Sequence, residues 1–293
     1  MKTYLLERLI CPSCGDGLSI DEQAAEYRCS NCTYHGEIYH GKPLFTGIAG
    51  DIQPFDKAPR GPSSGSPWRQ ANWRFLQQQV DKLPEEAVLM DVGAGHGDFA
   101  QIFEGRRAIL LDVFPYPEID IVCDLTQTVP FRTASFDAVV LMNVLEHVYD
   151  SRALFSAVKT LLRPGGVFVV AIPFLLKVHQ APYDFVRYTH FSLERLGQEF
   201  GLELLSLEGY YDPIFLLGEG WRNIERTALS GMSKYRRAAS RGLLWWIKTS
   251  AFVLERLVGK GYTHPSDSAT TPSPIGYHVV YRNQHSPGVQ SHS

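Results

Sequence analysis

The sequence predicts an α/β fold in which helices cover both faces of a mostly parallel sheet, preceded by a small cysteine-rich head. Three observations predict this architecture. From Ala87 onward, short apolar runs alternate with segments of helical periodicity, as in sheets of parallel strands. A glycine-rich turn follows the first of these runs. Four of the five cysteines fall between Cys11 and Cys32.

The overall composition is that of a globular protein. Of the 293 residues, 44% are hydrophobic, 20% charged and 12% aromatic, which excludes a wholly disordered, collagenous or coiled-coil chain. The formal net charge of −3 does not indicate a globally basic nucleic-acid binder. Charged residues interrupt the apolar stretches Met1–Ile10 and Gly242–Val258, so neither is typical of an export signal or a membrane span. We therefore expect a cytoplasmic protein whose thiols stay reduced.

The chain divides into a head, a body and a helical insertion. The Pro-, Gly- and Ser-rich stretch Pro59–Pro67 is typical of an exposed linker between the head and the body. The expected order is a head at 1–46, a linker and leading helix at 47–84, a core at 85–210, a helical cap insertion at 211–262, a loop and final strand at 263–283, and a mobile tail at 284–293.

The elements of the body follow from their periodicity. Apolar residues at helical spacing predict a leading helix over Trp68–Leu83, and continuous apolar runs predict buried strands. The expected strands are Ala87–Val92, Ala108–Val113, Ile119–Cys123, Phe136–Met142, Val167–Ile172, Leu202–Glu208 and Gly276–Tyr281. The expected helices between them are Asp98–Glu104, Ser151–Leu162 and most of 213–260.

The cysteines of the head are paired with the spacing of a metal site. Cys11-x2-Cys14 and Cys29-x2-Cys32 are separated by 14 residues, so each pair can hold one side of a tetrahedral ion. Redox or disulfide-forming thiols are the alternative, which a reducing compartment disfavours. We expect a structural zinc ion with four protein ligands, which stabilises the head and leaves no open position for chemistry.

A glycine-rich loop is the sharpest functional signal. The run Asp91-Val-Gly93-Ala94-Gly95-His-Gly97 carries a strand into a turn, and glycines there let a ligand lie against the backbone. The third glycine comes one residue earlier than in the dinucleotide fingerprint G-x-G-x-x-G. The Asp91 carboxylate would repel a pyrophosphate but suits a ligand that carries an ammonium group. A glycine-rich turn without a ligand is the alternative for this motif alone.

Two further aspartates follow the neighbouring strands. Asp112 ends the second strand, 21 residues after Asp91, and a carboxylate there can accept both hydroxyls of a ribose. Asp124 follows the third strand, where a carboxylate or neighbouring amides can reach an adenine amino group. The alternative for either aspartate alone is a solvated loop acid or a helix cap.

Further motifs follow the glycine loop in a fixed order. They are Cys123-Asp-Leu125 with Val129-Pro-Phe131, then Ser135–Val140, Asn143–Val148 and Leu161–Gly166. This order resembles the class I S-adenosylmethionine-dependent methyltransferases over roughly residues 85–210 and the final strand. The resemblance implies a Rossmann-like seven-stranded sheet with an antiparallel last strand, and S-adenosylmethionine as cofactor. The cofactor-binding residues that it implies are Asp91, Gly93, Ala94, Gly95, Gly97, Asp112, Val113, Asp124, Leu125 and Asn143.

The head and one short link refine this resemblance. The head looks like the zinc-ribbon activator subunits that bind certain methyltransferases, and like the zinc head of some ribosomal RNA methyltransferases. The link between Asp112 and Ile119 leaves little room for the helix that is usual in the family. Which side chain covers the adenine is therefore open.

The acceptor side is expected in Phe174–Thr189, which follows the fifth strand at the carboxyl edge of the sheet. Its run His-x-x-Pro-Tyr-Asp-Phe-x-Arg-Tyr-Thr resembles a subgroup of these methyltransferases. His179 or His147 is a candidate catalytic base, because imidazole titrates near neutral pH, although alignment alone can also supply much of the rate. Arg187 could hold an anionic group, or it could pair with Asp184 and brace the loop. The candidate substrate residues are Tyr183, Asp184, Arg187 and Tyr188.

Residues 213–260 are locally basic, with nine basic and three acidic residues. Trp221, Trp245 and Trp246 are interleaved with them. The segment could face an acidic acceptor, RNA or, by peripheral contact, an anionic membrane surface. The favoured interpretation is a helical cap with the tryptophans in its core and a solvated basic face.

Together these features predict an S-adenosylmethionine-dependent methyltransferase that acts on a small-molecule, glycan or lipid-linked acceptor. The head would be a docking or substrate-gripping module. The first alternative is an RNA methyltransferase that docks RNA through the zinc ribbon. The second is a non-catalytic zinc-containing scaffold that retains the fold. The sequence names neither the methylated atom nor the oligomeric state.

Overall fold

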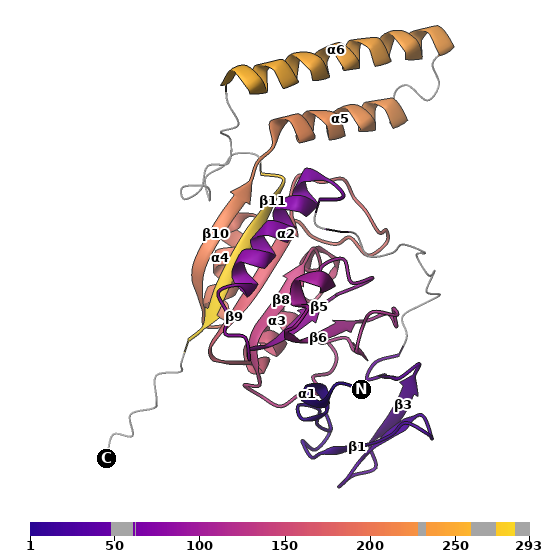
Figure 1. The fold of residues 1–293 in the computed structure, drawn as a ribbon, viewed down its shortest axis with the longest axis vertical. Coiled ribbons are helices and arrows are strands. Elements are labelled where there is room, and N and C mark those ends of the chain that lie inside the picture. Colours follow the sequence, from indigo (N-terminus) through magenta and orange to yellow (C-terminus); the bar gives the residue numbers. More distant parts are fainter. Residues whose placement is uncertain (48–60, 62, 228–232, 259–273, 285–293) are drawn as a thin grey trace, which may run out of the picture.

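The computed structural model describes residues 1–47, 61, 63–227, 233–258 and 274–284 (Figure 1). Residues 48–60 and 62, which include part of the expected linker, the loop at 263–273 and the tail at 285–293 lie outside these residues. The described chain forms a small head, a body built on one large sheet, and a pair of helices beyond one end of that sheet. None of the helices described is long and apolar enough to cross a membrane.

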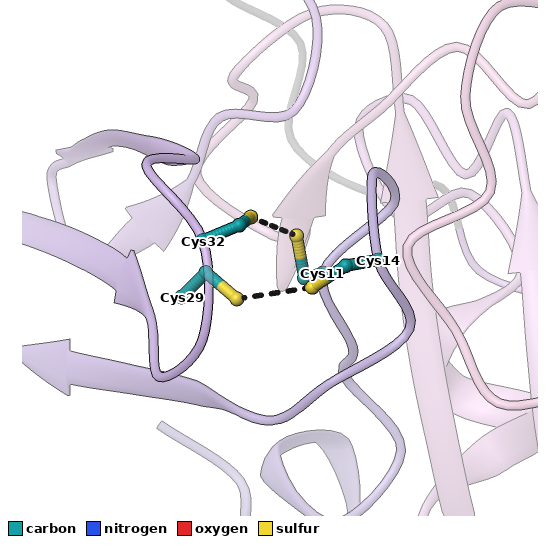
Figure 2. Close-up of side chains that lie close together, drawn as sticks. All are labelled: Cys11, Cys14, Cys29 and Cys32. Atoms are coloured by element: carbon teal, nitrogen blue, oxygen red, sulfur yellow. Dashed lines mark hydrogen bonds between the residues drawn. The ribbon is translucent and has the colours of Figure 1, made fainter.

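The head is a four-stranded antiparallel sheet preceded by a one-turn helix. The cysteine pairs lie on two loops, one before the first strand and one after the second, and they face each other (Figure 2). The helix α1 spans Thr3–Leu6, and the strands, paired in chain order, are β1 (Leu18–Asp21), β2 (Glu26–Cys29), β3 (His35–Tyr39) and β4 (Lys42–Pro43).

A seven-stranded sheet forms the centre of the body. Its strand order is β10-β11-β9-β8-β5-β6-β7, and β11 is antiparallel to both of its neighbours, whereas the other described strands run in one direction. The expectation of a seven-stranded sheet with an antiparallel last strand is therefore confirmed. The strands are β5 (Val88–Val92), β6 (Arg107–Asp112), β7 (Ile121–Val122), β8 (Phe136–Met142), β9 (Leu162–Pro173), β10 (Leu202–Tyr210) and β11 (Gly276–Asn283).

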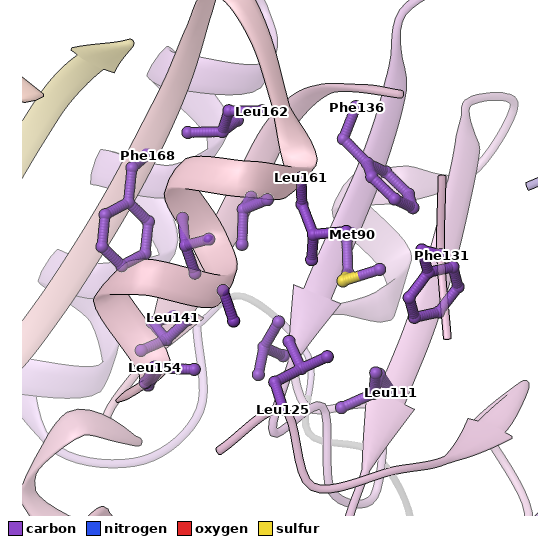
Figure 3. Packing of buried hydrophobic residues seen from close by; sticks show 14 of the residues in the cluster. Met90, Leu111, Leu125, Phe131, Phe136, Leu141, Leu154, Leu161, Leu162 and Phe168 are labelled. Atoms are coloured by element: carbon purple, nitrogen blue, oxygen red, sulfur yellow. The ribbon is translucent and has the colours of Figure 1, made fainter. Parts of the chain in front are cut away.

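Helices cover both faces of this sheet. Met90 of β5 joins a buried cluster with side chains of α3 (Ser151–Leu161) and α4 (His190–Glu199), part of which Figure 3 shows. The adjacent Leu89 joins a second cluster with side chains of α2 (Pro67–Val80). Because successive residues of a strand point to opposite faces, burial of both faces requires the continuous apolar runs seen in the sequence.

The head packs directly against the edge strand β7. Leu44 pairs with Val122 in a parallel bridge, and the Phe45 N–H donates to the Val122 carbonyl oxygen at 2.9 Å. Tyr27 of the head is buried in the same apolar cluster as Phe131 of the body. The head therefore covers an edge of the sheet whose backbone groups would otherwise lack pairing partners.

Two elements are shorter than the sequence predicts. The expected helix Asp98–Glu104 is a single 3₁₀ turn, η1, over Ala100–Phe103, because only nine residues separate Gly97 from the start of β6. The expected strand Ile119–Cys123 pairs only over the two residues of β7, although its flanking residues are buried. In both cases, burial of apolar side chains produced the sequence signal without a full regular element.

The helical insertion extends away from the sheet. Helices α5 (Pro213–Thr227) and α6 (Lys234–Val258) lie side by side beyond the end of β10 (Figure 1). The Trp245 and Trp246 side chains are 68% and 64% exposed. The expectation that these tryptophans form the core of a cap is therefore wrong, because α6 packs on α5 and not on the body.

Candidate functional site

The glycine loop at the carboxyl end of β5 is held against the end of β6. The N–H groups of Gly93 and Ala94 both donate to the Leu111 carbonyl oxygen, at 2.8 and 3.0 Å. Gly95 has a positive φ of 54°, and a Cβ atom placed there would meet no atom of the described residues within 4 Å. A Cβ at Gly93, in contrast, would lie 2.4 Å from Val144. The loop is thus packed on its inner side and open at Gly95, as a backbone surface for a ligand requires.

Asp112 and Asp91 lie beside this loop and are almost completely buried. The Gly95 N–H donates to Asp112 Oδ2 at 2.8 Å, and the Phe114 N–H donates to Asp112 Oδ1 at 3.0 Å. Burial raises the pKa of Asp112 to about 6. Burial and the neighbouring Asp112 carboxylate raise the pKa of Asp91 to about 7. Two buried carboxylates with little compensating charge favour a ligand that brings hydroxyl or ammonium donors.

An aromatic wall, Phe114 and Tyr116 with His96, lies next to Asp112. The rings of His96 and Tyr116 are 4.3 Å apart between centroids, and those of Phe114 and Tyr116 are 6.0 Å apart. Val113 leads from the strand into this wall. The short link after β6 thus supplies flat ring surfaces at the point where the sequence did not show which side chain covers the adenine. Phe114 and Tyr116, just after β6, are the sequence feature that could have predicted this surface.

Asp124 and Leu125 both have partners within the chain. The Asp124 carboxylate accepts hydrogen bonds from the Thr126 N–H and hydroxyl and from Gln127 Nε2, so it closes a local turn in a loop, and no described helix begins there. Its backbone N–H donates to the Thr46 hydroxyl at 3.1 Å, which links it to the head. The Leu125 side chain is buried in the core. The expected role of both residues in cofactor binding stays a prediction.

Asn143, which follows β8 with a positive φ of 57°, is committed to helix α2. Its Oδ1 atom accepts hydrogen bonds from Trp68 Nε1 at 2.8 Å and from Asn72 Nδ2 at 3.2 Å. Asn72 Oδ1 in turn lies 2.7 Å from Nε2 of the buried His278, whose ring stacks on Trp68. The Asn143 side chain, which was expected to bind the cofactor, therefore connects α2 to the carboxyl end of β8. The sequence alone did not reveal this network.

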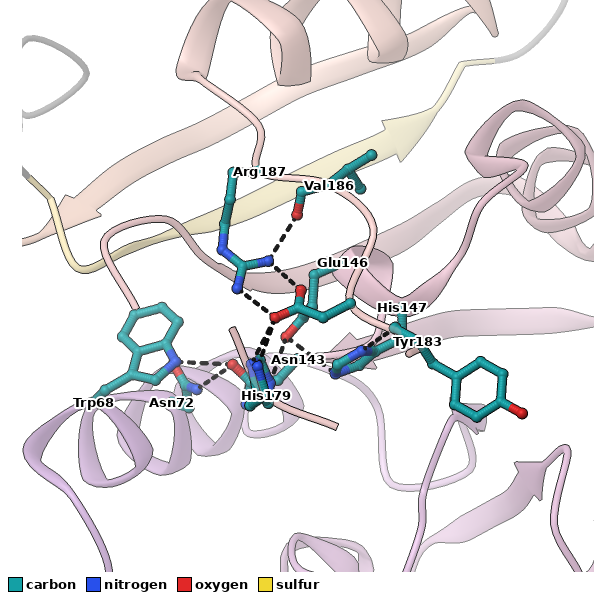
Figure 4. A network of polar contacts seen from close by, with 10 residues as sticks. Trp68, Asn72, Asn143, Glu146, His147, His179, Tyr183, Val186 and Arg187 are labelled. Atoms are coloured by element: carbon teal, nitrogen blue, oxygen red, sulfur yellow. Dashed lines mark hydrogen bonds and ion pairs between the residues drawn. The ribbon is translucent and has the colours of Figure 1, made fainter. Parts of the chain in front are cut away.

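A second polar cluster, the Glu146–His147–His179 cluster, lies at the carboxyl ends of β8 and β9 (Figure 4). Glu146 Oε1 lies 3.7 Å from His147 Nε2 and 3.7 Å from His179 Nε2. The centroids of the two imidazole rings are 4.8 Å apart. The Glu146 side chain is fully buried, and burial raises its pKa to about 8. Burial also lowers the pKa of His147. The structure thus brings both predicted histidines together and adds Glu146, which the sequence analysis did not select.

Asp184 and Arg187 form the brace that the sequence analysis kept as an alternative. Both Arg187 Nη atoms contact the Asp184 carboxylate, with Nη2 at 2.7 Å from Oδ2. The hydrogen bonds from Arg187 hold the pKa of Asp184 well below its usual range. Asp184 Oδ2 also accepts the His179 N–H at 2.9 Å and lies 3.1 Å from its Nδ1 atom. Arg187 therefore positions this carboxylate, and its charge is paired with that of Asp184.

The two tyrosines of this loop have different surroundings. The Tyr183 carbonyl oxygen is 2.7 Å from His147 Nδ1, while its ring is 51% exposed and points away from the cluster (Figure 4). Tyr188 is partly buried against the apolar core. Of the expected substrate residues, Tyr183 acts here through its backbone and Tyr188 through packing.

The four cysteine sulfurs of the head converge on one point (Figure 2). The Sγ atoms of Cys11 and Cys32 are 3.6 Å apart, those of Cys14 and Cys29 are 3.4 Å apart, and all four lie within 4.8 Å of one another. A tetrahedron of sulfurs at the usual Zn–S distance has edges of about 3.8 Å. The donor set and spacing therefore fit zinc. The fifth cysteine, Cys123, is buried in the core.

Comparison with known proteins agrees with this geometry. Residues 68–207 match the family described as methyltransferase domain. These residues form a methyltransferase domain. This methyltransferase domain contains the glycine loop, Asp112 and the Glu146–His147–His179 cluster, whereas the head precedes it and β11 follows it.

Individual relatives are similar over part of their length. A Mycolicibacterium smegmatis protein named "probable S-adenosylmethionine-dependent methyltransferase" is 34% identical over 29% of this chain and 37% of its own length. A ubiquinone biosynthesis O-methyltransferase of Histophilus somni is 27% identical over 32% of this chain and 48% of its own length. The chain thus spans less than half the length of these curated relatives. A solved S-adenosylmethionine-dependent methyltransferase from Archaeoglobus fulgidus superposes with a TM-score of 0.46 at 13% identity, covering 74% of this chain and 95% of the other.

Proposed function

We propose that the protein transfers the methyl group of S-adenosylmethionine to an oxygen of a small-molecule acceptor. The observation that carries the proposal is the position of two polar clusters at one sheet edge. The Asp91–Asp112 pair lies at the ends of β5 and β6, and the Glu146–His147–His179 cluster lies at the ends of β8 and β9. Val144, two residues before Glu146, packs against Gly93 of the loop. Ligands of open parallel sheets bind at this edge.

The cofactor side offers a partner for each part of S-adenosylmethionine. The ionised Asp112 carboxylate would accept the ribose hydroxyls, and Asp91 would face the positively charged methionine end. The open backbone at Gly95 would admit the cofactor close to the loop, and the rings of His96 and Tyr116 would border the adenine. When bound, S-adenosylmethionine supplies a methyl group already activated by its positive sulfonium.

The acceptor side suits a hydroxyl group. His147 Nδ1 and His179 Nδ1 each face an oxygen acceptor, which leaves both Nε2 atoms able to receive a proton. Asp184 would stabilise a positive charge on His179, which makes His179 the stronger candidate base. The O-methyltransferase names among the relatives support oxygen as the methylated atom.

We further propose that the cysteine quartet holds a structural zinc ion. Support comes from the sulfur separations and from the position of the head on β7, at the cofactor side of the sheet. The Thr46 contact with Asp124 gives the head a direct connection to the strand ends. The head would therefore buttress the cofactor side, in place of the substrate-gripping role expected from the sequence.

The test is a transfer assay with S-adenosylmethionine that carries a radiolabelled methyl group. The acceptors are phenols and catechols, saccharides, lipid extracts and RNA, offered separately to the full chain. We expect label in a small hydroxylated acceptor and its loss in Asp112→Ala, with Arg28→Ala, an exposed head variant, as the control that retains transfer. Label in RNA would favour the RNA alternative, and cofactor binding without transfer to any fraction would favour the scaffold.

A further inference from the structure

The Glu146–His147–His179 cluster leaves buried polar atoms without partners. Within the part of the chain that the structure describes, neither Glu146 carboxylate oxygen has a hydrogen bond, nor does His147 Nε2. The 3.7 Å separations between Glu146 Oε1 and the two Nε2 atoms are too long for direct hydrogen bonds. Buried polar atoms normally have a bonding partner. This arrangement therefore indicates that one bound group belongs between Glu146 Oε1, His147 Nε2 and His179 Nε2.

The opposite nitrogens of both imidazole rings are held by oxygen atoms. His147 Nδ1 lies 2.7 Å from the Tyr183 carbonyl oxygen, and His179 Nδ1 lies 3.1 Å from Asp184 Oδ2. These contacts place the ring protons on Nδ1 and the lone pairs on Nε2, directed toward Glu146. Arg187 orients the Asp184 carboxylate. Histidines that ligate metal ions have this arrangement, with the other nitrogen donating to a carbonyl or carboxylate.

We propose that Glu146, His147 and His179 bind one divalent transition-metal ion. Two imidazole nitrogens and one carboxylate oxygen suit ions such as Zn²⁺, Co²⁺, Fe²⁺ or Mn²⁺. Ligand atoms at the usual bond lengths of a tetrahedral site are about 3.4 Å apart, so the two 3.7 Å separations from Glu146 Oε1 need to close by only a few tenths of an ångström. All three ligand atoms lie within 4.8 Å of one another. Three protein ligands leave a coordination position open for an external oxygen, unlike the four-cysteine cluster of the head.

The ion gives the acceptor side a different chemistry from an imidazole base. It would take the Nε2 lone pairs, bind the acceptor hydroxyl at its open position and lower the pKa of that hydroxyl, so that its proton passes to solvent water. The oxygen would then attack the sulfonium methyl: the O–CH3 bond forms as the S–CH3 bond breaks, and S-adenosylhomocysteine leaves with the electron pair on its sulfur. This role rests on the proposed function. The binding of the ion does not, and it can be measured without cofactor or acceptor.

The experiment is a Co²⁺ titration of the full chain with zinc already in the head, followed by visible absorption and equilibrium dialysis. We expect one Co²⁺ per chain, with the visible bands of nitrogen and oxygen ligation and without the intense near-ultraviolet band of thiolate ligation. Glu146→Gln should weaken binding at least about 100-fold, and Asp184→Asn about 10- to 100-fold. Glu199→Gln, on the surface of α4, is the matched control and should bind like the wild type.

The variants separate the two metal sites. Cys29→Ser should lose zinc and keep the Co²⁺ site, whereas Glu146→Gln should keep zinc and lose the Co²⁺ site. Glu146→Gln is isosteric, and a thermal melt verifies that it folds. No additional Co²⁺ in the wild type, or unchanged binding in Glu146→Gln, would overturn the proposal. Methyl transfer that persists without any such site would leave the proposed function standing and assign proton removal to His179.

Discussion

Asp91 and Asp112 should make the proposed cofactor binding depend on pH. Both have a pKa raised by burial, to about 7 and about 6, above the value near 3.9 of an exposed aspartate. The ligand-free site therefore takes up protons as the pH falls through 7 and 6, whereas the ribose and the ammonium group require ionised carboxylates. We expect the affinity for S-adenosylmethionine to fall about tenfold or more between pH 7.5 and 5.5, measured by calorimetry. An equally steep loss in Asp91→Asn would refute the role of Asp91.

The pair formed by Asp184 and Arg187 couples stability to the acceptor loop. The Asp184 carboxylate is buried and Arg187 only partly exposed, so removal of either partner leaves the other poorly compensated. We expect Asp184→Ala and Arg187→Ala each to lower the free energy of unfolding by about 2–3 kcal/mol, as measured in denaturant. The double variant should be no less stable than the worse single variant. Additive losses would show that the two side chains act independently.

The sequence predicted best those residues whose role depends on other residues close to them along the chain. The cysteine quartet and Asp112 were found because paired cysteines and a strand-end acid are visible in a short window. The side-chain contacts of Asn143 were not foreseen because its partners, Trp68 and Asn72, come from a helix some seventy residues earlier. Glu146 was overlooked because its burial and its distance to His179 arise only when two strand ends meet.

At the scale of elements, the head should depend on its metal. Cys29→Ser removes one of four thiolates, so we expect metal analysis to show loss of the single zinc and amide exchange to show opening of β1–β3. Because the head covers β7 and contacts Asp124, the cofactor should bind about 3- to 10-fold more weakly. Cys123→Ser, in the buried core, is the matched control and should keep its zinc. Full zinc retention in Cys29→Ser would exclude the quartet as the site.

Helix α6 should tolerate the loss of its tryptophans. Because Trp245 and Trp246 are mostly exposed, Trp245→Ser and Trp246→Ser should each change the free energy of unfolding by no more than about 0.5 kcal/mol. Trp68, which is 4% exposed and packs on His278, provides the contrast, and Trp68→Ala should cost about 3–5 kcal/mol. Thermal melts of the three variants decide this. A large loss in either α6 variant would mean that the helix has a buried face.

The sequence predicted the elements of the sheet better than those of the insertion. Strands buried on both faces need unbroken apolar runs, and such runs can be found without knowledge of their neighbours. The amphipathic pattern of α5 and α6 predicts helices but does not say which surface they cover. The sequence predicted a longer helix in place of the single 3₁₀ turn at Ala100–Phe103 for a related reason. The apolar residues of this turn pack in the core although the connection is too short for a helix.

At the scale of the whole molecule, two polar clusters lie at the carboxyl ends of the parallel strands, and the head packs on the edge strand β7. The strand order separates the proposed cofactor site at β5 and β6 from the proposed acceptor site at β8 and β9, while the Gly93–Val144 contact keeps the two regions adjacent. Variants of Asp112 should therefore affect mainly cofactor binding. Variants of Glu146 or His179 should affect mainly transfer to the acceptor.

Calorimetric titration of S-adenosylmethionine into the wild type and Asp112→Ala at pH 7.5 tests the central claim most directly. The account predicts one cofactor per wild-type chain. It also predicts a loss of about 2–4 kcal/mol of binding free energy in the variant, because charge-assisted hydrogen bonds to two ribose hydroxyls disappear. No binding by the wild type, or the same affinity in Asp112→Ala, would contradict the account.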